Sequence, residues 1–166
     1  MSISHTPHPT SANRDAEVRK FLTLRLGDEI YGLPIMRVRE IIGLVPITPL
    51  PQTPAFVKGV MNLRGRIIPV VDLRARFALP EIAATHESCI VIVDGIDGDR
   101  SLTGIVVDAV REVQNILPSA ITPPPDLGGA RERMIEGVGR VKNEVVLLLD
   151  PDGLLDFGSE PARQAA

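Results

Sequence analysis

The chain of 166 residues contains no tryptophan, one tyrosine, four phenylalanines and a single cysteine. A single cysteine excludes an internal disulfide and any zinc site built from paired thiolates. So few aromatic rings provide no platform on which nucleic-acid bases could stack. The formal net charge is −3, so there is no surplus of Lys and Arg to neutralise phosphates. We therefore expect no nucleic-acid partner.

Long apolar runs are also missing. No stretch approaches the ~20 apolar residues that a membrane span requires, and the first twenty residues lack the apolar centre of a secretory signal. We expect a cytoplasmic protein with no direct membrane insertion. Hydrophobic residues make up 44% of the chain and are mostly Val, Ile and Leu, a composition that favours β-strands.

The two ends of the chain hold little that could be buried. Residues 1–17 and 158–166 are therefore predicted to be disordered tails. His5 and His8 lie in the first tail, where we expect them to be solvated rather than to hold a metal. Residues 18–157 are predicted to form a single domain.

Between the tails, short apolar runs alternate with turn residues. Residues 21–33 predict a hairpin with its turn at 27–29. Residues 89–93 form a continuous apolar run, typical of a strand covered on both faces, and 102–107 predict a further strand. The pattern favours a mainly β fold with a few short helices.

An internal repeat divides the domain into two similar halves. Residues 31–41 align with 103–113 at an offset of 72, and both copies contain Gly followed by Leu or Ile, then Val-Arg-Glu. Residues 59–72 align with 137–150 at an offset of 78; both begin with Gly-Val and end with Asp. The additional six residues fall in the connecting segment, as expected of an exposed loop.

Each half is too short to be stable by itself. A unit of ~60 residues buries only about 60% of its surface. Two β-barrel subdomains are therefore predicted at approximately 20–80 and 86–157, packed together, with exchange of a terminal strand as an alternative. Closure into small barrels of four or five strands would remove exposed sheet edges.

Three short helices are predicted from capping signals. Thr53 followed by Pro54 predicts a helix over residues 53–58. Asp72 can cap residues 73–79, and Asp150 precedes Pro151 in the same arrangement. The repeated aspartate is therefore explained by capping rather than by catalysis.

No motif for catalysis, a cofactor or a metal is recognisable in the chain. His86 and Cys89 are the only candidates for nucleophilic chemistry, but side chains three residues apart on an extended chain point to opposite faces. Asp94, Asp97 and Asp99 are expected to form a solvated hairpin. A binding protein without enzymatic activity is favoured, and a small enzyme using His86 and Cys89 is an alternative.

The segment Asn62–Gly65 is predicted to be a hairpin tip, with Gly65 in the turn conformation. The turn does not explain Arg64, because the conformation of a hairpin turn does not require a guanidinium group. The repeat places Lys142 opposite Arg64 and Glu112 opposite Glu40. We predict an ion pair between Glu40 and Arg64. Its role would be to hold the Arg64 side chain in position rather than to stabilise the fold.

Several runs resemble the CheW-like domain family. GVMNLRGRIIPVVDLRARF is similar to the family signature G-V-x-N-L-R-G, an apolar strand with Pro, and D-L-R. YGLPIMRVREI resembles the first hairpin of the family and the element that follows it. GIVVDAVREV and GVGRVKNEVVLLLDPDGLL resemble its second half, so the likeness covers about residues 18–157.

The resemblance implies two SH3-like five-stranded β-barrel subdomains packed together. It also implies a cytoplasmic, non-enzymatic adaptor without cofactors that is recruited to receptor arrays. There it would couple chemoreceptors (methyl-accepting chemotaxis proteins) to the regulatory domain of the histidine kinase CheA. The alternative is a CheW-like adaptor of a non-flagellar pathway controlling surface motility or gene expression.

In the family, the cytoplasmic hairpin tip of the receptor lies in a groove between the subdomains. The resemblance carries the receptor-binding role to five residues: Val38, Glu40, Asn62, Leu63 and Arg64. These residues would belong to the binding surface or support it. No compact motif marks the residues that would contact the kinase.

Overall fold

The structure is a computed structural model that describes residues 17–95, 98–124 and 131–156. Except for Glu17, the predicted tails lie outside these ranges. None of the helices in these ranges has both the length and the hydrophobicity of a membrane span.

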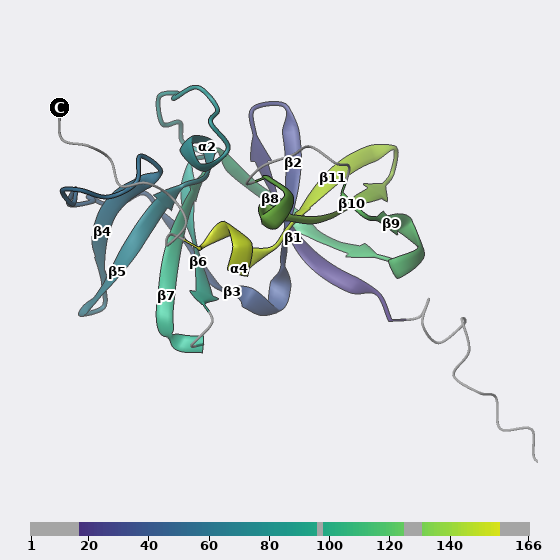
Figure 1. Cartoon of the computed structure of the whole chain (residues 1–166), viewed down its shortest axis with the longest axis horizontal. Coiled ribbons are helices and arrows are strands. Elements are labelled where there is room, and N and C mark those ends of the chain that lie inside the picture. Colours follow the sequence, from purple (N-terminus) through teal and green to yellow (C-terminus); the bar gives the residue numbers. More distant parts are fainter. Residues whose placement is uncertain (1–16, 96–97, 125–130, 157–166) are drawn as a thin grey trace, which may run out of the picture.

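The described chain forms two β-sheets that lie side by side (Figure 1). The first sheet has six strands in the order β8 (Ala109–Ile116), β1 (Arg19–Leu26), β2 (Glu29–Pro34), β11 (Glu144–Leu149), β10 (Ile135–Val141) and β9 (Ile121–Thr122). The second has five in the order β3 (Val38–Gly43), β6 (Cys89–Gly95), β7 (Gly98–Val107), β5 (Arg66–Asp72) and β4 (Val57–Leu63). The predicted hairpin at the start of the domain is confirmed as β1 and β2.

Each half of the chain gives its first hairpin to the sheet of the other half. The hairpin β1–β2 joins the six-stranded sheet because β2 pairs in parallel with β11. The hairpin β6–β7 joins the five-stranded sheet because β7 pairs in parallel with β5. The sheets therefore do not follow the consecutive segments 20–80 and 86–157, and whole hairpins are exchanged rather than a terminal strand.

The segment that follows an edge strand closes each sheet into a small barrel. After β8, the chain passes through the short helix η2 (Pro118–Ala120), and β9 then pairs with β10 at the opposite edge. After β3, Thr48 exchanges two backbone hydrogen bonds of 2.9 Å with Val60 of β4. The prediction of two packed β-barrel subdomains is confirmed, although one has six strands rather than five.

This closure explains why the sequence repeat has a glycine at positions 59 and 137. A Cβ atom on Gly59 would overlap the carbonyl oxygen of Thr48, and Gly59 has φ of +145°. A Cβ atom on Gly137 would lie 2.9 Å from the carbonyl oxygen of Thr122. The closing segment crosses the barrel wall so closely at both positions that only glycine fits.

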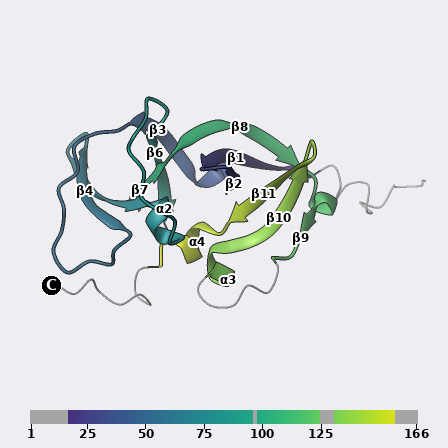
Figure 2. The ribbon, with the colours of Figure 1, turned by 90° about the horizontal axis from the view of Figure 1, so that it is seen from above.

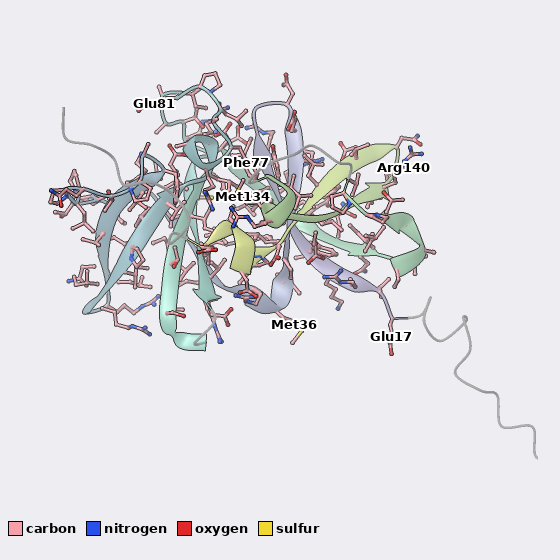
Figure 3. The ribbon with its side chains drawn as sticks, viewed as in Figure 1. Glu17, Met36, Phe77, Glu81, Met134 and Arg140 are labelled. Carbon is pink, nitrogen blue, oxygen red and sulfur yellow. The ribbon has the colours of Figure 1, made fainter. Side chains whose placement is uncertain are left out.

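The largest core lies between the two barrels rather than inside either one. Its buried residues come from both sheets and from the helical segments, and they include Tyr31, Phe77 and Met134. The rings of Tyr31 and Phe77 stack with centroids 5.1 Å apart. Figure 3 shows Phe77 and Met134 at the centre of the molecule. This shared core makes the two barrels one packed unit.

The barrel interiors form two smaller clusters. The five-stranded barrel encloses Met61, Leu63, Ile68, Val70, Ile90 and Ile92. The six-stranded barrel encloses Phe21, Ile116, Val146 and Leu148. Strand β6 lies between an interior and the shared core, so residues 90–93 are fully buried, as their continuous apolar run predicted.

The helices are short and lie near the junction of the barrels. Two follow capping aspartates as predicted: α2 (Leu73–Arg76) after Asp72, and α4 (Pro151–Leu154) after Asp150. A third, α3 (Arg131–Met134), precedes β10, and Figure 2 shows α2 and α4 between the barrels. The predicted helix over residues 53–58 is wrong: this stretch is a turn that leads into β4, whose pairing with β5 overrides the capping signal.

Candidate partner-binding site

The five residues predicted to bind a partner lie on two edge strands of the five-stranded barrel. Val38 and Glu40 are on β3, Asn62 and Leu63 end β4, and Arg64 begins the turn that follows. Strands β3 and β4 are at opposite ends of the sheet order. Closure of the barrel brings these two edges together, so the five residues form one region.

Arg64 and Glu40 form the predicted ion pair across these edges. The Nη1 and Nη2 groups of Arg64 donate to the two carboxylate oxygens of Glu40 at 2.6 and 2.7 Å. These hydrogen bonds lower the pKa of the Glu40 carboxyl and raise the pKa of Arg64. The Arg64 side chain is 72% exposed. Since an exposed pair adds little stability, its effect is to hold the guanidinium in place.

The turn between β4 and β5 explains Asn62 and Gly65. Arg64 has φ of +49° and Gly65 has φ of +87°, the pattern of a two-residue type I′ turn. The Gly65 N–H donates to the Asn62 side-chain oxygen at 2.8 Å. Both residues therefore shape the turn, and this turn directs Arg64 toward β3.

Leu63 and Val38 have mainly structural environments. Leu63 is 9% exposed and packs inside the five-stranded barrel. Val38 is half-buried against the core between the barrels. Of the five predicted residues, Asn62 and Arg64 are exposed, Glu40 and Val38 are half-buried, and Leu63 is buried.

A second cluster of charges beside this region was missed by the sequence analysis. Asp94 of β6 is buried, and its carboxylate oxygens accept from Arg37 at 2.8 Å and Arg39 at 2.7 Å. The prediction of a solvated hairpin is therefore wrong for Asp94; Asp97 and the side chain of Asp99 lie outside the described residues. Arginines on both sides of Val38 were the available signal, but nothing in the sequence indicated their partner.

Arg37 also links the β2–β3 connection to α4. It lies in the short helix η1 (Ile35–Arg37), and its Nη2 group donates to Asp152 at 2.9 Å. Burial by itself would lower the pKa of Arg37. The hydrogen bonds to Asp152 and Asp94 outweigh this effect and raise the pKa of Arg37. The preceding Met36 is 88% exposed, and its side chain points away from the molecule in Figure 3.

A groove of about 1120 Å³ lies between the barrels. Its walls come from β5, the β6–β7 hairpin, the start of β10 and α4, and none of the five predicted residues lines it. Arg66 and Ile67, just beyond the turn of Arg64, do line it. Ile67 is 65% exposed, a large apolar surface for a strand residue.

The equivalent region of the six-stranded barrel has the same turn with different charges. Lys142 and Asn143 have φ of +50° and +66°, so this turn matches that of Arg64 and Gly65. Here, however, the ion pair joins Arg111 to Glu144 at 3.1 Å. The repeat thus reproduced the turn and not the charge pattern that the sequence suggested.

The alternative site for nucleophilic chemistry gains no support from its surroundings. His86 is exposed in the loop before β6, and Cys89 is half-buried at the start of that strand. Burial raises the pKa of the Cys89 thiol, which disfavours the reactive thiolate. Across the described ranges, no three His, Cys, Asp or Glu side chains are grouped so that they could hold a metal ion.

The chain matches the CheW-like domain model over residues 20–158. It is 35% identical over 138 residues to the chemotaxis protein CheW of Klebsiella aerogenes, covering 82% of this chain and 81% of that protein. It is also 35% identical to the chemotaxis protein CheW of Rhizobium meliloti, covering 89% and 92%. Protein FrzA of Myxococcus xanthus is 32% identical, covering 89% of each chain.

A solved structure has the same fold. The crystal structure of the scaffolding protein TtCheW from Thermoanaerobacter tengcongensis superposes with a TM-score of 0.78 at 33% identity, covering 87% of this chain and 97% of that one. The exchanged hairpins, the closed barrels and the NLRG turn thus occur in a chain that matches CheW proteins along most of its length. The chain belongs to the CheW-like domain family, whose members are scaffold and adaptor proteins rather than enzymes.

Proposed function

We propose that this protein couples chemoreceptors to the histidine kinase CheA. In this proposal, the cytoplasmic hairpin tip of the receptor binds the region formed by β3 and the β4–β5 turn. The observation that supports it is the exposed ion pair of Glu40 and Arg64, which has little value for stability and is held in a defined position.

Each of the five residues has a distinct part in this binding. Arg64 is the anchor, because two of its five N–H groups bind Glu40 and its exposed side chain presents the rest to a partner. Glu40 orients the guanidinium, and Asn62 shapes the turn that carries it. Leu63 and Val38 support the surface from below.

The kinase would bind elsewhere on the same packed unit. The core between the barrels joins both sheets, so a displacement at the receptor surface moves the molecule as a whole. The protein would then pass receptor state to the regulatory domain of CheA as a change in relative orientation, at receptor arrays in the cytoplasm.

Co-sedimentation with receptor fragments and CheA tests this proposal. Arg64→Glu reverses the charge of the anchor and repels Glu40, so receptor binding should fall at least tenfold, or about 1.4 kcal/mol. Lys142→Glu makes the same change at the equivalent turn of the other barrel and is the matched control. Kinase activation should fall with Arg64→Glu and remain near wild type with Lys142→Glu.

Urea unfolding of both variants shows whether the fold is intact. The proposal fails if folded Arg64→Glu protein binds receptor and activates CheA as well as the wild type. It also fails if both variants lose binding equally, because the loss would then follow from charge alone.

A second candidate is a role in a chemosensory pathway that does not control flagella. It is favoured by the identity to FrzA, which at 32% is close to the 35% shared with the chemotaxis CheW proteins. Deletion of the gene distinguishes the two candidates. Loss of swimming chemotaxis supports the flagellar pathway, whereas normal swimming with altered surface motility or gene expression supports the second.

A further inference from the structure

Strand β3 contains a β-bulge next to Glu40. Val38 pairs with Val93 of β6, and Glu40 pairs with the neighbouring Ile92. Arg39 is therefore an extra residue, inserted in β3 between two consecutive positions of β6. Val93 packs in the core between the barrels, whereas Ile92 packs inside the five-stranded barrel. The bulge thus turns positions 38 and 40 to opposite faces of the sheet, although a regular strand would place them on one face.

The side chain of this extra residue is held in place by a buried acid. The Nη2 group of Arg39 lies 2.7 Å from Oδ2 of Asp94 on β6. The Asp94 side chain is 10% exposed, whereas the Arg39 side chain is 45% exposed. The buried carboxylate therefore fixes the direction of a guanidinium group that remains at the surface.

The burial of Asp94 does not by itself account for Arg39. Arg37 already binds the other carboxylate oxygen of Asp94 at 2.8 Å through its Nε group, and its Nη2 group donates to the Asp94 backbone oxygen at 2.9 Å. A buried carboxylate requires a charged partner, and Arg37 provides one. The second acid that Arg37 binds, Asp152, is 52% exposed and is therefore also solvated by water. Arg39 adds a positive charge at the surface of β3.

The repeat offers a comparison for this arginine. The offset of 72 places Arg111 of β8 at the position of Arg39, and the pairing of β8 with β1 is irregular at the same point. Arg111, however, pairs with Glu144 at 3.1 Å, and that carboxylate is 49% exposed. The arginine held by a buried acid is thus the one on β3, the strand that also carries Glu40.

The neighbouring ion pair has the same arrangement, with the base outside the acid. The Arg64 side chain is 72% exposed, and that of its partner Glu40 is 29% exposed. Arg39 and Arg64 therefore present two positioned guanidinium groups at one end of the five-stranded barrel, and their acids lie deeper. A guanidinium group binds a carboxylate through two parallel N–H donors, so this surface is suited to acidic side chains.

We propose that Arg39 is a second basic contact of the partner-binding region, and that the receptor segment bound there presents carboxylates to Arg39 and Arg64. This inference rests on the proposed function and adds the chemistry of the partner to it. The receptor tip would be selected by its acidic side chains. The complementary charges would also accelerate the encounter and make it sensitive to salt.

Two versions of a chemoreceptor cytoplasmic fragment test the inference. One has its natural hairpin tip, and in the other the Asp and Glu residues of the tip are replaced by Asn and Gln. The wild-type protein should bind the natural fragment about tenfold more tightly than the neutralised one at low salt. The difference should shrink at about 0.5 M salt, where surface charges are screened.

Arg39→Gln in the full chain assigns the effect to this residue. It should weaken binding of the natural fragment about fivefold and leave binding of the neutralised fragment unchanged. Arg39→Lys keeps the charge and should lose less. Arg111→Gln is the matched control: it removes the equivalent arginine of the other barrel and should leave both affinities unchanged. Urea unfolding of each variant checks that the protein remains folded.

The outcomes separate this inference from the proposed function. Equal binding of the two fragments by the wild type would overturn the inference, whether or not the Arg39 variants fold. An equal loss for both fragments with Arg39→Gln would also overturn it, because Arg39 would then act only through the shape of β3. In both cases weaker binding by Arg64→Glu would leave the proposed function standing. Failure of the wild type to bind the natural fragment would overturn both.

Discussion

The two barrels share a backbone plan but carry different charges on it. Both have a two-residue turn with positive φ, at residues 64–65 and 142–143. Both also have a glycine beneath the closing segment, Gly59 and Gly137. These positions repeat because the backbone geometry permits few alternatives there.

The surface pairs beside these turns do not repeat. In the five-stranded barrel the turn supplies the base and β3 supplies the acid, as Arg64 and Glu40. In the six-stranded barrel β8 supplies the base and β11 the acid, as Arg111 and Glu144. A repeated backbone therefore does not fix the exposed charges on it. One barrel can present a charged surface that the other lacks.

A similar reversal occurs where the chain crosses between the barrels. At one crossing Arg74 of α2 binds Asp108, which follows β7, at 2.6 Å. At the other crossing the arginine is on the connection and the acid on the helix, as Arg37 and Asp152. Asp108 also accepts from the backbone N–H of Gly27 at 2.8 Å, so the first link is the more extensive.

Separating the halves of the chain is the strongest test of this comparison. We expect fragments 1–83 and 84–166 to be unfolded when alone, because each hairpin completes the sheet of the other half. Mixed or co-expressed, they should assemble. Circular dichroism and urea titration measure this, and a cooperative transition in either fragment alone would show that the halves are independent repeats.

The two glycines beneath the closing segments should differ in sensitivity. Gly59→Ala meets backbone and also requires a side chain at positive φ, so we expect it to lower the free energy of unfolding by more than about 3 kcal/mol. Gly137→Ala has only the close contact, and we expect about 1–2 kcal/mol. Urea unfolding checks the order; equal losses would mean that closure is equivalent in both barrels.

The ion pairs at the two crossings between the barrels, Arg74–Asp108 and Arg37–Asp152, should differ less in their effect on the free energy of unfolding. Asp108→Asn should cost about 2 kcal/mol at neutral pH, because Asp108 is buried and Arg74 loses its partner. Asp152→Asn should cost less than about 1 kcal/mol, because its side chain is 52% exposed. Urea unfolding of each variant beside the wild type measures both losses.

The Asp108 link should also depend on pH. Hydrogen bonds from Arg74 lower the pKa of Asp108 below its ordinary value near 3.8. Its contribution is therefore fully present above that value and is lost as the pH falls through the pKa of the folded protein. The stability difference between wild type and Asp108→Asn should shrink in acid, and a constant difference down to pH ~2 would contradict this assignment.

The smallest stability effects are expected at the exposed pairs. Glu40→Gln and Glu144→Gln should both leave the urea midpoint close to that of wild type, since both pairs are exposed to solvent. The two variants should differ only in receptor binding. Glu40→Gln should weaken it, because Arg64 is then no longer held in place, and Glu144→Gln should not. Equal binding by both would remove the functional distinction between the barrels.

Most local features followed from the sequence. The first hairpin, the caps at Asp72 and Asp150 and the turn with Gly65 were all predicted, and each depends on residues near in sequence. The Glu40–Arg64 pair was also predicted, although closure of the barrel forms it and the other barrel does not repeat it. The helix expected over residues 53–58 failed because strand pairing, a tertiary interaction, outweighed a local cap.

The chain by itself determined a β protein of two similar halves, because alternating apolar runs, turn residues and the repeat act through neighbouring residues. Only the tertiary structure decided that the halves exchange hairpins, that Asp94 is buried between two arginines, and that a groove opens beside Arg66 rather than at the five predicted residues. These outcomes depend on segments far apart in sequence, which meet only because their apolar faces share one core.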